Sequence, residues 1–184
     1  MHAAQERGII APIIGSASFY KDLCTPMQLH ILVGTVHGNA TEVAQTLAFA
    51  AAELGFEPQV LPMDGLTIAA FAQGGLFLLC CSTTGNGDVP DNAQALYQSL
   101  DLQPQYLGTT RYGLVALGDS SYGDTFCGGA KAFDTRLQDL GAQRIGAMCE
   151  IDAMLADDAP TQALAWWVQW AAQIPQQQAA PSAA

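Results

Sequence analysis

The most informative segment of the chain is Tyr112-Gly113-Leu114-Val115-Ala116-Leu117, which continues as Gly118-Asp119-Ser120-Ser121-Tyr122-Gly123-Asp124-Thr125-Phe126-Cys127-Gly128-Gly129. Its first six residues have the length and apolar character of a buried strand. Beyond the small-residue turn, an apolar pattern at i, i+4 and i+7 is typical of a helix packed on a sheet, and it consists of Phe133, Leu137 and Leu140. The turn therefore lies at the carboxyl end of a strand, where open α/β sheets bind their ligands. Its aromatic and acidic residues, Tyr122 and Asp119, suit a flat ring.

Outward from this segment, apolar runs of strand length alternate with helical patterns. We predict strands at residues 29–34, 59–61, 76–81, 112–117 and 143–151. The run at 76–81 is apolar throughout, which indicates that helices cover both faces of the sheet. The alternation predicts an α/β fold with a doubly wound, five-stranded parallel sheet, right-handed crossovers and helices on both faces.

Two helical patterns precede the opening segment. The first helix is expected to end at Gly55, a typical C-cap, and its apolar face consists of Val43, Leu47, Ala51 and Leu54. The second helix is expected to have Asp91 or Asn92 as its N-cap, and its apolar residues are Ala93, Leu96 and Leu100.

The last helix is expected to begin at Asp158 as N-cap, with Pro160 in its first turn. Its buried face is predicted to consist of Leu164, Trp167, Val168 and Ala171. Three tryptophans crowd this helix, namely Trp166, Trp167 and Trp170. Core packing with partial exposure explains them better than a binding box, which stays open as the alternative.

Length and composition fit one domain. The chain has 184 residues, half of them hydrophobic, which is enough for a single full core. We place the domain at residues 27–174, because Met27 directly precedes the first strand. Residues 175–184 contain only Gln, Ala, Pro and Ser and are expected to be disordered.

Residues 1–26 form an N-terminal extension with an apolar patch at 8–19, which Pro12 interrupts. A signal peptide has a more basic start and a cleaner apolar run, and the patch is too short to span a bilayer. We therefore expect the extension to be disordered or to be a start-site artefact, and we expect no membrane association.

Acidic residues outnumber basic ones by 17 to 6, and no Lys or Arg occurs in residues 22–110. This charge pattern argues strongly against a nucleic-acid-binding surface, because such a surface needs clustered positive charge. Two interpretations of the acid excess stay open: simple solubility, and docking onto basic partner proteins.

Cysteine and histidine usage gives no sign of a metal centre or a nucleophilic site. The chain has no Cys-x-x-Cys motif, and the adjacent Cys80 and Cys81 are predicted to point to opposite faces of a strand. This usage indicates reduced, mostly buried thiols in a cytoplasmic protein. His30 is expected to be a strand residue rather than a ligand.

The first strand ends in the turn Gly34-Thr35-Val36-His37-Gly38-Asn39-Ala40-Thr41-Glu42. Backbone amides of such a turn and of the first helical residues point outward, and the helix dipole favours negative charge there. The hydroxyls of Thr35 and Thr41 are further donors. The turn matches neither a Walker loop nor a Gly-x-Gly-x-x-Gly fingerprint, so a weak anion site and a plain turn both stay open.

The third strand leads into Ser82-Thr83-Thr84-Gly85-Asn86-Gly87-Asp88-Val89-Pro90-Asp91-Asn92. Gly85 and Gly87 permit positive φ and Asn86 tolerates it, so a peptide bond here can take two orientations. The alternative is an Asx-rich turn before a capped helix.

The three loops are expected to converge on one edge of the sheet, where they would hold a phosphate and a planar heterocycle.

These loops resemble those of the flavodoxin family. Residues 34–41 are similar to its phosphate loop, residues 82–91 to its second flavin loop and residues 118–129 to its third. The resemblance covers residues 27–174 and is greatest to the MioC-like short-chain flavodoxins; the same motifs occur in the FMN domain of sulfite reductase flavoproteins. It implies a flavodoxin-like sheet with strand order 2-1-3-4-5.

The resemblance also implies FMN as the cofactor. Thr35, the amides of residues 38–41 and His37 are expected at the phosphate, Tyr122 stacked on the isoalloxazine, and Asp119 at its pyrimidine edge. The full set of expected FMN-binding residues is Thr35, Val36, His37, Gly38, Asn39, Ala40, Thr41, Ser82, Thr83, Thr84, Gly85, Asn86, Gly87, Leu117, Gly118, Asp119, Ser120, Ser121, Tyr122, Phe126 and Cys127.

Three positions depart from the family pattern. His37 and Ala40 stand where hydroxyl residues are usual, which predicts weaker or pH-sensitive phosphate binding. Thr84 stands where many members have an aromatic residue, so one flavin face is expected to be more open to solvent. The Tyr-to-Phe spacing after Tyr122 is one residue longer than usual.

The function implied is that of a monomeric, low-potential one-electron carrier. Its partners would be a basic donor of the flavodoxin/ferredoxin-NADP reductase type and an acceptor enzyme, docked through the acidic surface. Two other functions stay open on the same fold: an FMN-dependent NAD(P)H quinone or nitro reductase, and a flavin-free binding module.

Overall fold

The computed structural model describes residues 26–155 and 158–174, so the predictions for the N-terminal extension, for Cys24 and for residues 175–184 lie outside the described residues. The strands are β1 Met27–Gly34, β2 Phe56–Pro62, β3 Gly75–Ser82, β4 Thr110–Gly118, β5 Gln143–Arg144 and β6 Cys149–Asp152. The α-helices are α1 Asn39–Glu53, α2 Gln94–Leu102, α3 Gly128–Asp139 and α4 Ala159–Ala171. Short 3₁₀ helices are η1 Ile68–Phe71, η2 Asp91–Ala93 and η3 Ser120–Thr125.

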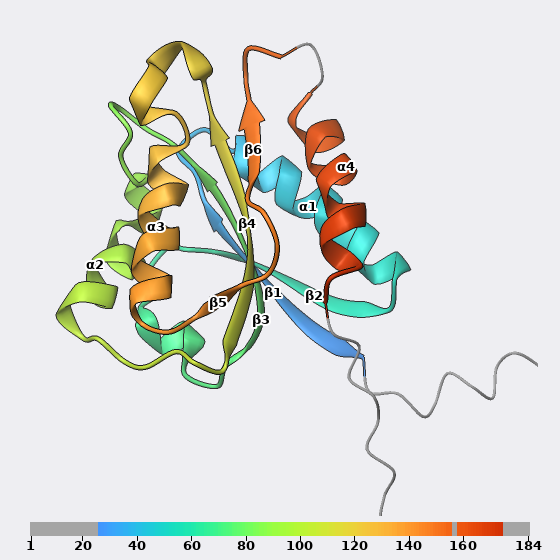
Figure 1. Cartoon of the computed structure of the whole chain (residues 1–184), viewed down its shortest axis with the longest axis vertical. Helices are drawn as coiled ribbons and strands as arrows, with labels where there is room; N and C mark the ends of the chain where they lie inside the picture. Colours follow the sequence, from blue (N-terminus) through green and yellow to red (C-terminus); the bar gives the residue numbers. More distant parts are fainter. Residues whose placement is uncertain (1–25, 156–157, 175–184) are drawn as a thin grey trace, which may run out of the picture. The chain divides into compact units, whose positions relative to one another are not determined.

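All strands of the sheet are parallel, in the order β2-β1-β3-β4, with β5 and β6 both paired to β4 (Figure 1). The predicted doubly wound sheet and its 2-1-3-4-5 order are therefore confirmed. The predicted single strand at residues 143–151 is wrong, because Gly146 has a φ of +63°. The carbonyls of Ile145 and Ala147 accept hydrogen bonds from two indole N–H groups of α4, at 3.0 and 2.9 Å. The chain thus leaves the sheet between β5 and β6.

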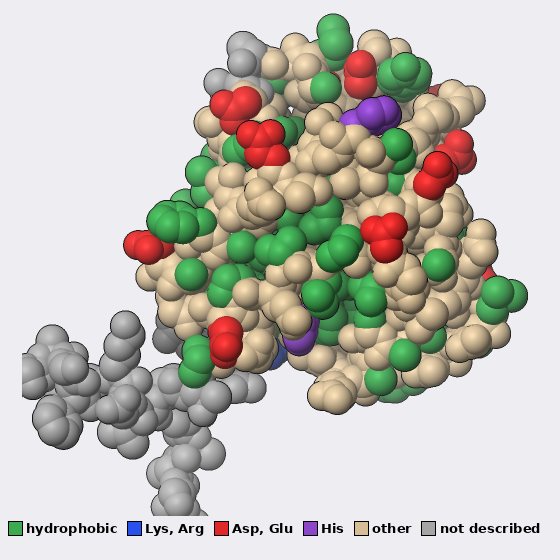
Figure 2. Space-filling view, turned by 180° about the vertical axis from the view of Figure 1, so that it is seen from behind, with side chains coloured by type: hydrophobic (Ala, Val, Ile, Leu, Met, Phe, Trp, Pro, Cys, Tyr) green, Lys and Arg blue, Asp and Glu red, His purple; other side chains and the backbone are tan. Residues whose placement is uncertain are grey.

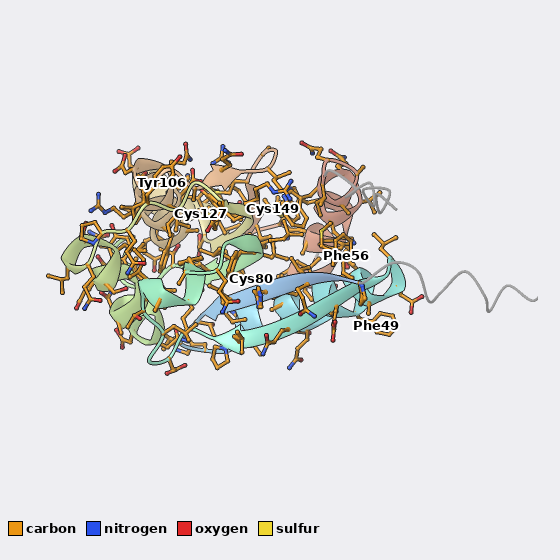
Figure 3. All side chains as sticks on the ribbon, turned by 90° about the horizontal axis from the view of Figure 1, so that it is seen from below. Phe49, Phe56, Cys80, Tyr106, Cys127 and Cys149 are labelled. Carbon is orange, nitrogen blue, oxygen red and sulfur yellow. The ribbon has the colours of Figure 1, made fainter. Side chains whose placement is uncertain are left out.

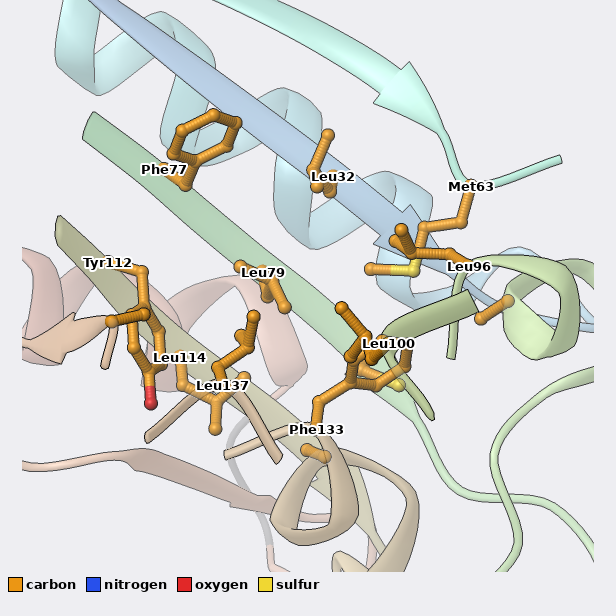
Figure 4. Close-up of a cluster of buried hydrophobic side chains, with 14 of the residues drawn as sticks. Leu32, Met63, Phe77, Leu79, Leu96, Leu100, Tyr112, Leu114, Phe133 and Leu137 are labelled. Carbon is orange, nitrogen blue, oxygen red and sulfur yellow. The ribbon is translucent and has the colours of Figure 1, made fainter. Parts of the chain in front are cut away.

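Helices cover both faces of the sheet, as predicted. α2 and α3 lie on one face and α1 and α4 on the other (Figure 1). Figure 4 shows Leu79, Leu114 and Phe133 packed between the sheet and the first pair of helices. The free cysteines that the structure describes are buried; Figure 3 labels Cys80, Cys127 and Cys149 among them. Cys81 belongs to this core, whereas Cys80 belongs to the other.

Helix ends follow the predictions in part. Asp158 caps α4 by accepting a hydrogen bond from the Thr161 amide at 2.8 Å, and Gly55 has a φ of +85° just beyond α1. The predicted cap of α2 by Asp91 or Asn92 is wrong, because both residues lie in η2 and neither caps it. The Asn92 side chain reaches back to the end of β1 instead.

The predicted buried faces are correct except at Leu54, Leu164 and Val168, which are exposed; Leu140 and Ala171 are half-buried against the core. Leu54 lies beyond the end of α1 and is 60% exposed. On α4 the buried residues are Ala163, Trp167 and Trp170, whereas Leu164 and Val168 are exposed. α4 is rotated so that its Trp170 side faces the sheet, because Gly113 leaves room there for the indole. A Cβ at residue 113 would lie 2.4 Å from Trp170 Cε2.

The tryptophans are core residues, as expected. Trp167 and Trp170 are buried, and Trp166 stacks on Trp170 with ring centroids 5.3 Å apart. His30 lies within β1 beside Phe77 and is a strand residue. No helix in residues 26–155 and 158–174 has the length and hydropathy needed to cross a membrane.

We expect Gly113→Ala to destabilise the protein by about 1–3 kcal/mol, because the added methyl group overlaps the Trp170 ring. Urea unfolding measures the loss. In a Trp170→Phe background the same substitution should cost less, since the smaller ring leaves space. An equal cost in both backgrounds would show that the indole is not the obstacle.

We expect the folded state to lose stability above about pH 9, since the thiols of the unfolded chain ionise at about pH 8.5. Burial raises the pKa of the Cys81, Cys127 and Cys149 thiols to about 12 and that of Cys80 further. The unfolded chain therefore ionises first. Below the pKa of an unfolded thiol, these thiols do not change the free energy of unfolding. As the pH rises from there toward 12, they lower it by up to about 1.4 kcal/mol per pH unit per thiol.

Urea titrations under reducing conditions at several pH values between about 8 and about 10.5 test this slope. A Cys149→Ala variant removes one buried thiol and should show a shallower slope. A flat profile in the unmodified protein would contradict the assignment of these thiols as buried and neutral.

Candidate functional site: a cleft at the carboxyl edge of the sheet

A cleft of about 630 Å³ lies at the carboxyl ends of β1, β3, β4 and β6. Its walls come from the three loops singled out in the sequence and from the connection between β6 and α4. The expected FMN-binding residues that line it are His37, Asn39, Ser82, Thr83, Thr84, Gly85, Gly87, Leu117, Gly118, Asp119, Tyr122, Phe126 and Cys127. The convergence of the loops on one edge is thus confirmed.

The other expected residues lie around this cleft rather than in its wall. Four of them, Thr35, Val36, Gly38 and Thr41, line a neighbouring cleft of about 610 Å³. Ala40 is fully buried in the core. Asn86, Ser120 and Ser121 are exposed on the second and third loops. The first loop therefore separates two hollows and presents different residues to each.

Backbone amides dominate the first loop. Gly38 has a φ of +89° and its carbonyl accepts hydrogen bonds from the amides of Thr41 and Glu42 at 2.9 and 3.2 Å. The Gly38 amide donates to Thr35 Oγ1 at 3.1 Å, which leaves the Thr35 hydroxyl hydrogen free to donate. Within the described residues the amides of Val36, His37, Asn39 and Ala40 have no hydrogen-bond partner. With the positive end of the α1 dipole, they form a donor-rich turn suited to an anion.

Asn92 holds this loop and was missed as a functional residue in the sequence. Its Oδ1 accepts a hydrogen bond from the Thr35 amide at 2.8 Å, and its Nδ2 donates to the Val33 carbonyl at 3.2 Å. The amide side chain thereby joins the start of the first loop to the end of β1, where the Val33 carbonyl also accepts a hydrogen bond from the Met63 amide. An Asn directly after Pro90-Asp91 predicted a cap, and no local signal distinguishes that role from this long-range one.

The second loop is a tight turn with an unpaired hydroxyl beside it. Thr84 and Asp88 exchange backbone hydrogen bonds at 3.0 and 2.8 Å, and Gly85 and Gly87 both have positive φ, as the sequence predicted. Thr83 lines the cleft, and its hydroxyl oxygen is buried and has no hydrogen-bond partner in the structure. A buried polar atom without a partner is costly, so a ligand that supplies one fits this wall.

The third loop is built around Asp119. Its carboxylate accepts hydrogen bonds from the Ser121 amide at 2.8 Å and from the Ser121 hydroxyl, so it caps η3. Tyr122 follows with 60% of its side chain exposed, at the mouth of the cleft. The loop ends at Cys127, a non-glycine residue with a φ of +58°, which is a strained conformation.

Glycines let the second and third loops touch. A Cβ on Gly128 would lie 2.5 Å from the Gly87 carbonyl oxygen, and one on Gly129 would lie 2.8 Å from that of Asp88. The two loops therefore meet backbone to backbone. Any side chain at residues 128 or 129 would push them apart and open the cleft.

The connection from β6 to α4 forms a fourth wall, which sequence reasoning did not assign. The cleft is lined here by Asp152 at the end of β6, by Leu155 and Asp158 of the connection, and by Pro160 and Gln162 in the first turn of α4. Hydrogen bonds from Ser120 and from the Met154 amide lower the pKa of Asp152. The short acidic segment at residues 152–158 is similar to that of the MioC-like flavodoxins, but the sequence does not indicate that it lines the site; the three-dimensional structure brings it there.

The charged residues of the cleft wall are acidic. They are Glu42, Asp119, Asp152 and Asp158, and no Lys or Arg is among the lining residues that the structure describes. Lys131 lies close by on α3, but its ammonium contacts Glu150 at 2.8 Å and the Phe126 carbonyl at 2.9 Å. An anionic group in the cleft must therefore be bound by neutral donors.

Burial keeps Cys127 as a neutral thiol, with its pKa raised to about 12, which argues against a nucleophilic role.

Comparison with known proteins agrees with this architecture. The Flavodoxin family model matches residues 31–167. Flavodoxin YqcA of Escherichia coli K12 is 37% identical over 143 residues, which cover 78% of this chain and 95% of that protein. Protein MioC of the same organism is 31% identical over 140 residues, covering 76% of this chain and 93% of the relative.

The fold agrees as well. The structure of a cysteine-to-serine mutant of flavodoxin from Pseudomonas aeruginosa superposes with a TM-score of 0.71 at 37% sequence identity, covering 80% of this chain and 98% of that one. Flavodoxins bind flavin and transfer electrons, and the cleft described above has the donors and the aromatic residue that such a cofactor needs. The chain therefore belongs to the flavodoxin family.

Proposed function

We propose that this protein binds FMN in the carboxyl-edge cleft and acts as a low-potential one-electron carrier. Membership of the flavodoxin family supports a flavin-binding electron carrier. The observation that carries the finer proposal is the combination of free amides in the first loop, which borders the cleft and its neighbour, with an unpaired buried hydroxyl at Thr83 and an exposed Tyr122 in the cleft wall. These groups match the phosphate, the polar edge and the flat face of FMN.

The phosphate would be held by neutral donors of the first loop. The candidates are the amides of Val36, His37, Asn39 and Ala40 together with the Thr35 hydroxyl. Hydrogen bonds to a charged acceptor contribute about 1.5–3 kcal/mol each, so four or five suffice to hold a phosphate monoester without a cation. His37 lies on the cleft wall and adds a ring N–H.

The ring would lie between the second and third loops. Tyr122 is 60% exposed and lines the cleft, as do Thr84, Gly85 and Gly87 of the second loop. Asp119 acts mainly through the loop that it caps, since one carboxylate oxygen is bonded to Ser121. Backbone groups beside it are then the better candidates for the pyrimidine edge.

When bound, FMN supplies the one-electron redox chemistry. The acidic cleft would adjust the redox potential of the flavin, because Glu42, Asp152 and Asp158 disfavour added negative charge on the ring. A tenfold shift in preference between two redox states changes a one-electron potential by about 59 mV. A site with several carboxylates and no cation is therefore expected to lower the potential of the fully reduced state.

The acid excess of the whole chain supports docking onto basic partners, here proposed as a reductase of the flavodoxin/ferredoxin-NADP type and an acceptor enzyme. The formal net charge is −11, and the face seen in Figure 2 carries scattered acidic side chains and almost no basic ones. Electrostatic attraction between complementary charges speeds such encounters, and added salt weakens it.

The cofactor is tested directly by the colour of the purified protein. We expect a yellow protein, or one that turns yellow when FMN is added, and reversible bleaching by dithionite. Colourless protein that fails to bind added FMN would overturn the proposal in favour of a flavin-free module. Rapid NAD(P)H oxidation without an added reductase would instead indicate an enzymatic reductase.

Tyr122→Ala is expected to raise the Kd for FMN about two- to tenfold and to shift its potentials, because ring stacking contributes about 0.5–1.5 kcal/mol. Flavin fluorescence titration measures the affinity. Tyr106→Ala is the matched control, since Tyr106 is 86% exposed and precedes β4 at the opposite edge of the sheet. Unchanged binding in Tyr122→Ala would remove this ring from the site.

A further inference from the structure

Asp152 stands where β6 meets the third loop. β6 ends at this residue, and its register places Asp152 opposite Gly118, the last residue of β4. The third loop therefore departs directly beside the Asp152 side chain. This placement gives a residue on one strand access to the loop that follows its neighbour.

One carboxylate oxygen of Asp152 joins two segments. Its Oδ1 accepts a hydrogen bond from the Ser120 amide at 3.1 Å and another from the Met154 amide at 3.0 Å. The Ala153 amide adds a backbone hydrogen bond to the Gly118 carbonyl at 2.9 Å. Gln162 of α4 lies within 3.4 Å of both the amide and the carbonyl of Asp152. The loop, the end of β6 and the start of α4 thus meet at one residue.

The third loop has little else to hold its first half. η3 contains no buried residue, and Gly123 interrupts it with φ +56° and ψ −117°. The hydrogen bonds of residues 119–122 within the described chain join members of the loop itself, apart from those that the amide and the side chain of Ser120 make to Asp152. The position of Tyr122 relative to the sheet therefore depends strongly on that contact.

We propose that Asp152 is a positioning residue, which fixes the third loop through Oδ1 and thereby holds Tyr122 at the cleft wall. It acts as a hydrogen-bond acceptor, and its negative charge is secondary for this task. The proposal rests on the proposed function only in that Tyr122 is taken to contact FMN. The contact between Ser120 and Asp152, called the tether below, is present in the chain without any ligand.

Acceptor and charge are separated by substitution. Asp152→Ala removes both, whereas Asp152→Asn keeps an acceptor oxygen and removes the charge. Asp124→Ala is the charge control, because Asp124 is an exposed carboxylate of the same loop that does not line the cleft. Ser120→Pro removes both the amide and the hydroxyl donor from the other side of the contact. Proline is favoured at the first position of a helix, and Asp119, with φ −131° and ψ 117°, has the extended backbone that a following proline needs.

Two measurements are made on each variant: hydrogen exchange of the loop amides without flavin, and the Kd for FMN by fluorescence titration. In Asp152→Ala we expect the Ser120 and Met154 amides to exchange at least tenfold faster and the Kd to rise about tenfold. Asp152→Asn and Asp124→Ala should bind FMN within about twofold of the unmodified protein. Ser120→Pro should weaken binding as Asp152→Ala does, and the double variant should be no worse than either.

The proposal is overturned if Asp152→Ala leaves both amide exchange and FMN affinity unchanged. It is also overturned if Asp152→Asn is as weak as Asp152→Ala, because the charge would then be what matters. If Asp152→Ala does not fold, Ser120→Pro decides by the same two measurements. If no variant and not even the unmodified protein binds FMN, the proposed function fails, while the exchange rates still test the tether.

Discussion

Parallel pairing of β1, β3, β4 and β6 is the constraint on which the site depends. The register aligns the strand ends: Gly34 lies opposite Cys81, Ser82 opposite Leu117, and Gly118 opposite Asp152. Because these residues are neighbours, the four segments that follow them must leave the sheet side by side at one edge. The cleft is a consequence of this alignment, and each loop then needs only a local device to take its shape.

Those local devices are of two kinds. Polar side chains bridge elements that are distant in sequence, as Asn92 does for the first loop and Asp152 for the third. Glycines permit backbones to touch, as Gly128 does against Gly87. Both kinds fix loops without a large apolar core beneath them, which suits an edge where polar groups must remain available to a ligand.

Local and non-local information explain how far the sequence predicts this structure. The strands, the two-sided core and the convergence of the loops follow from apolar periodicity, which is a local property of each segment. The break between β5 and β6, the rotation of α4 toward Trp170 and the bridge made by Asn92 depend on contacts between distant residues, such as Gly113 with Trp170. The wall around Asp152 was missed for the same reason, since its partners lie in other elements.

The site joins two electrostatic properties that appear opposed. Its first loop attracts an anion through free amides and the α1 dipole, whereas carboxylates surround the rest of the cleft. Amide donors act only within hydrogen-bond distance, but carboxylates act over the Debye length of about 8 Å at physiological salt. A phosphate seated among the amides is thus stabilised locally, while extra electrons on an adjoining ring are disfavoured by the wider field. In the proposed FMN complex, this difference in range would let one cleft bind an anionic cofactor and still lower the potential of its fully reduced state.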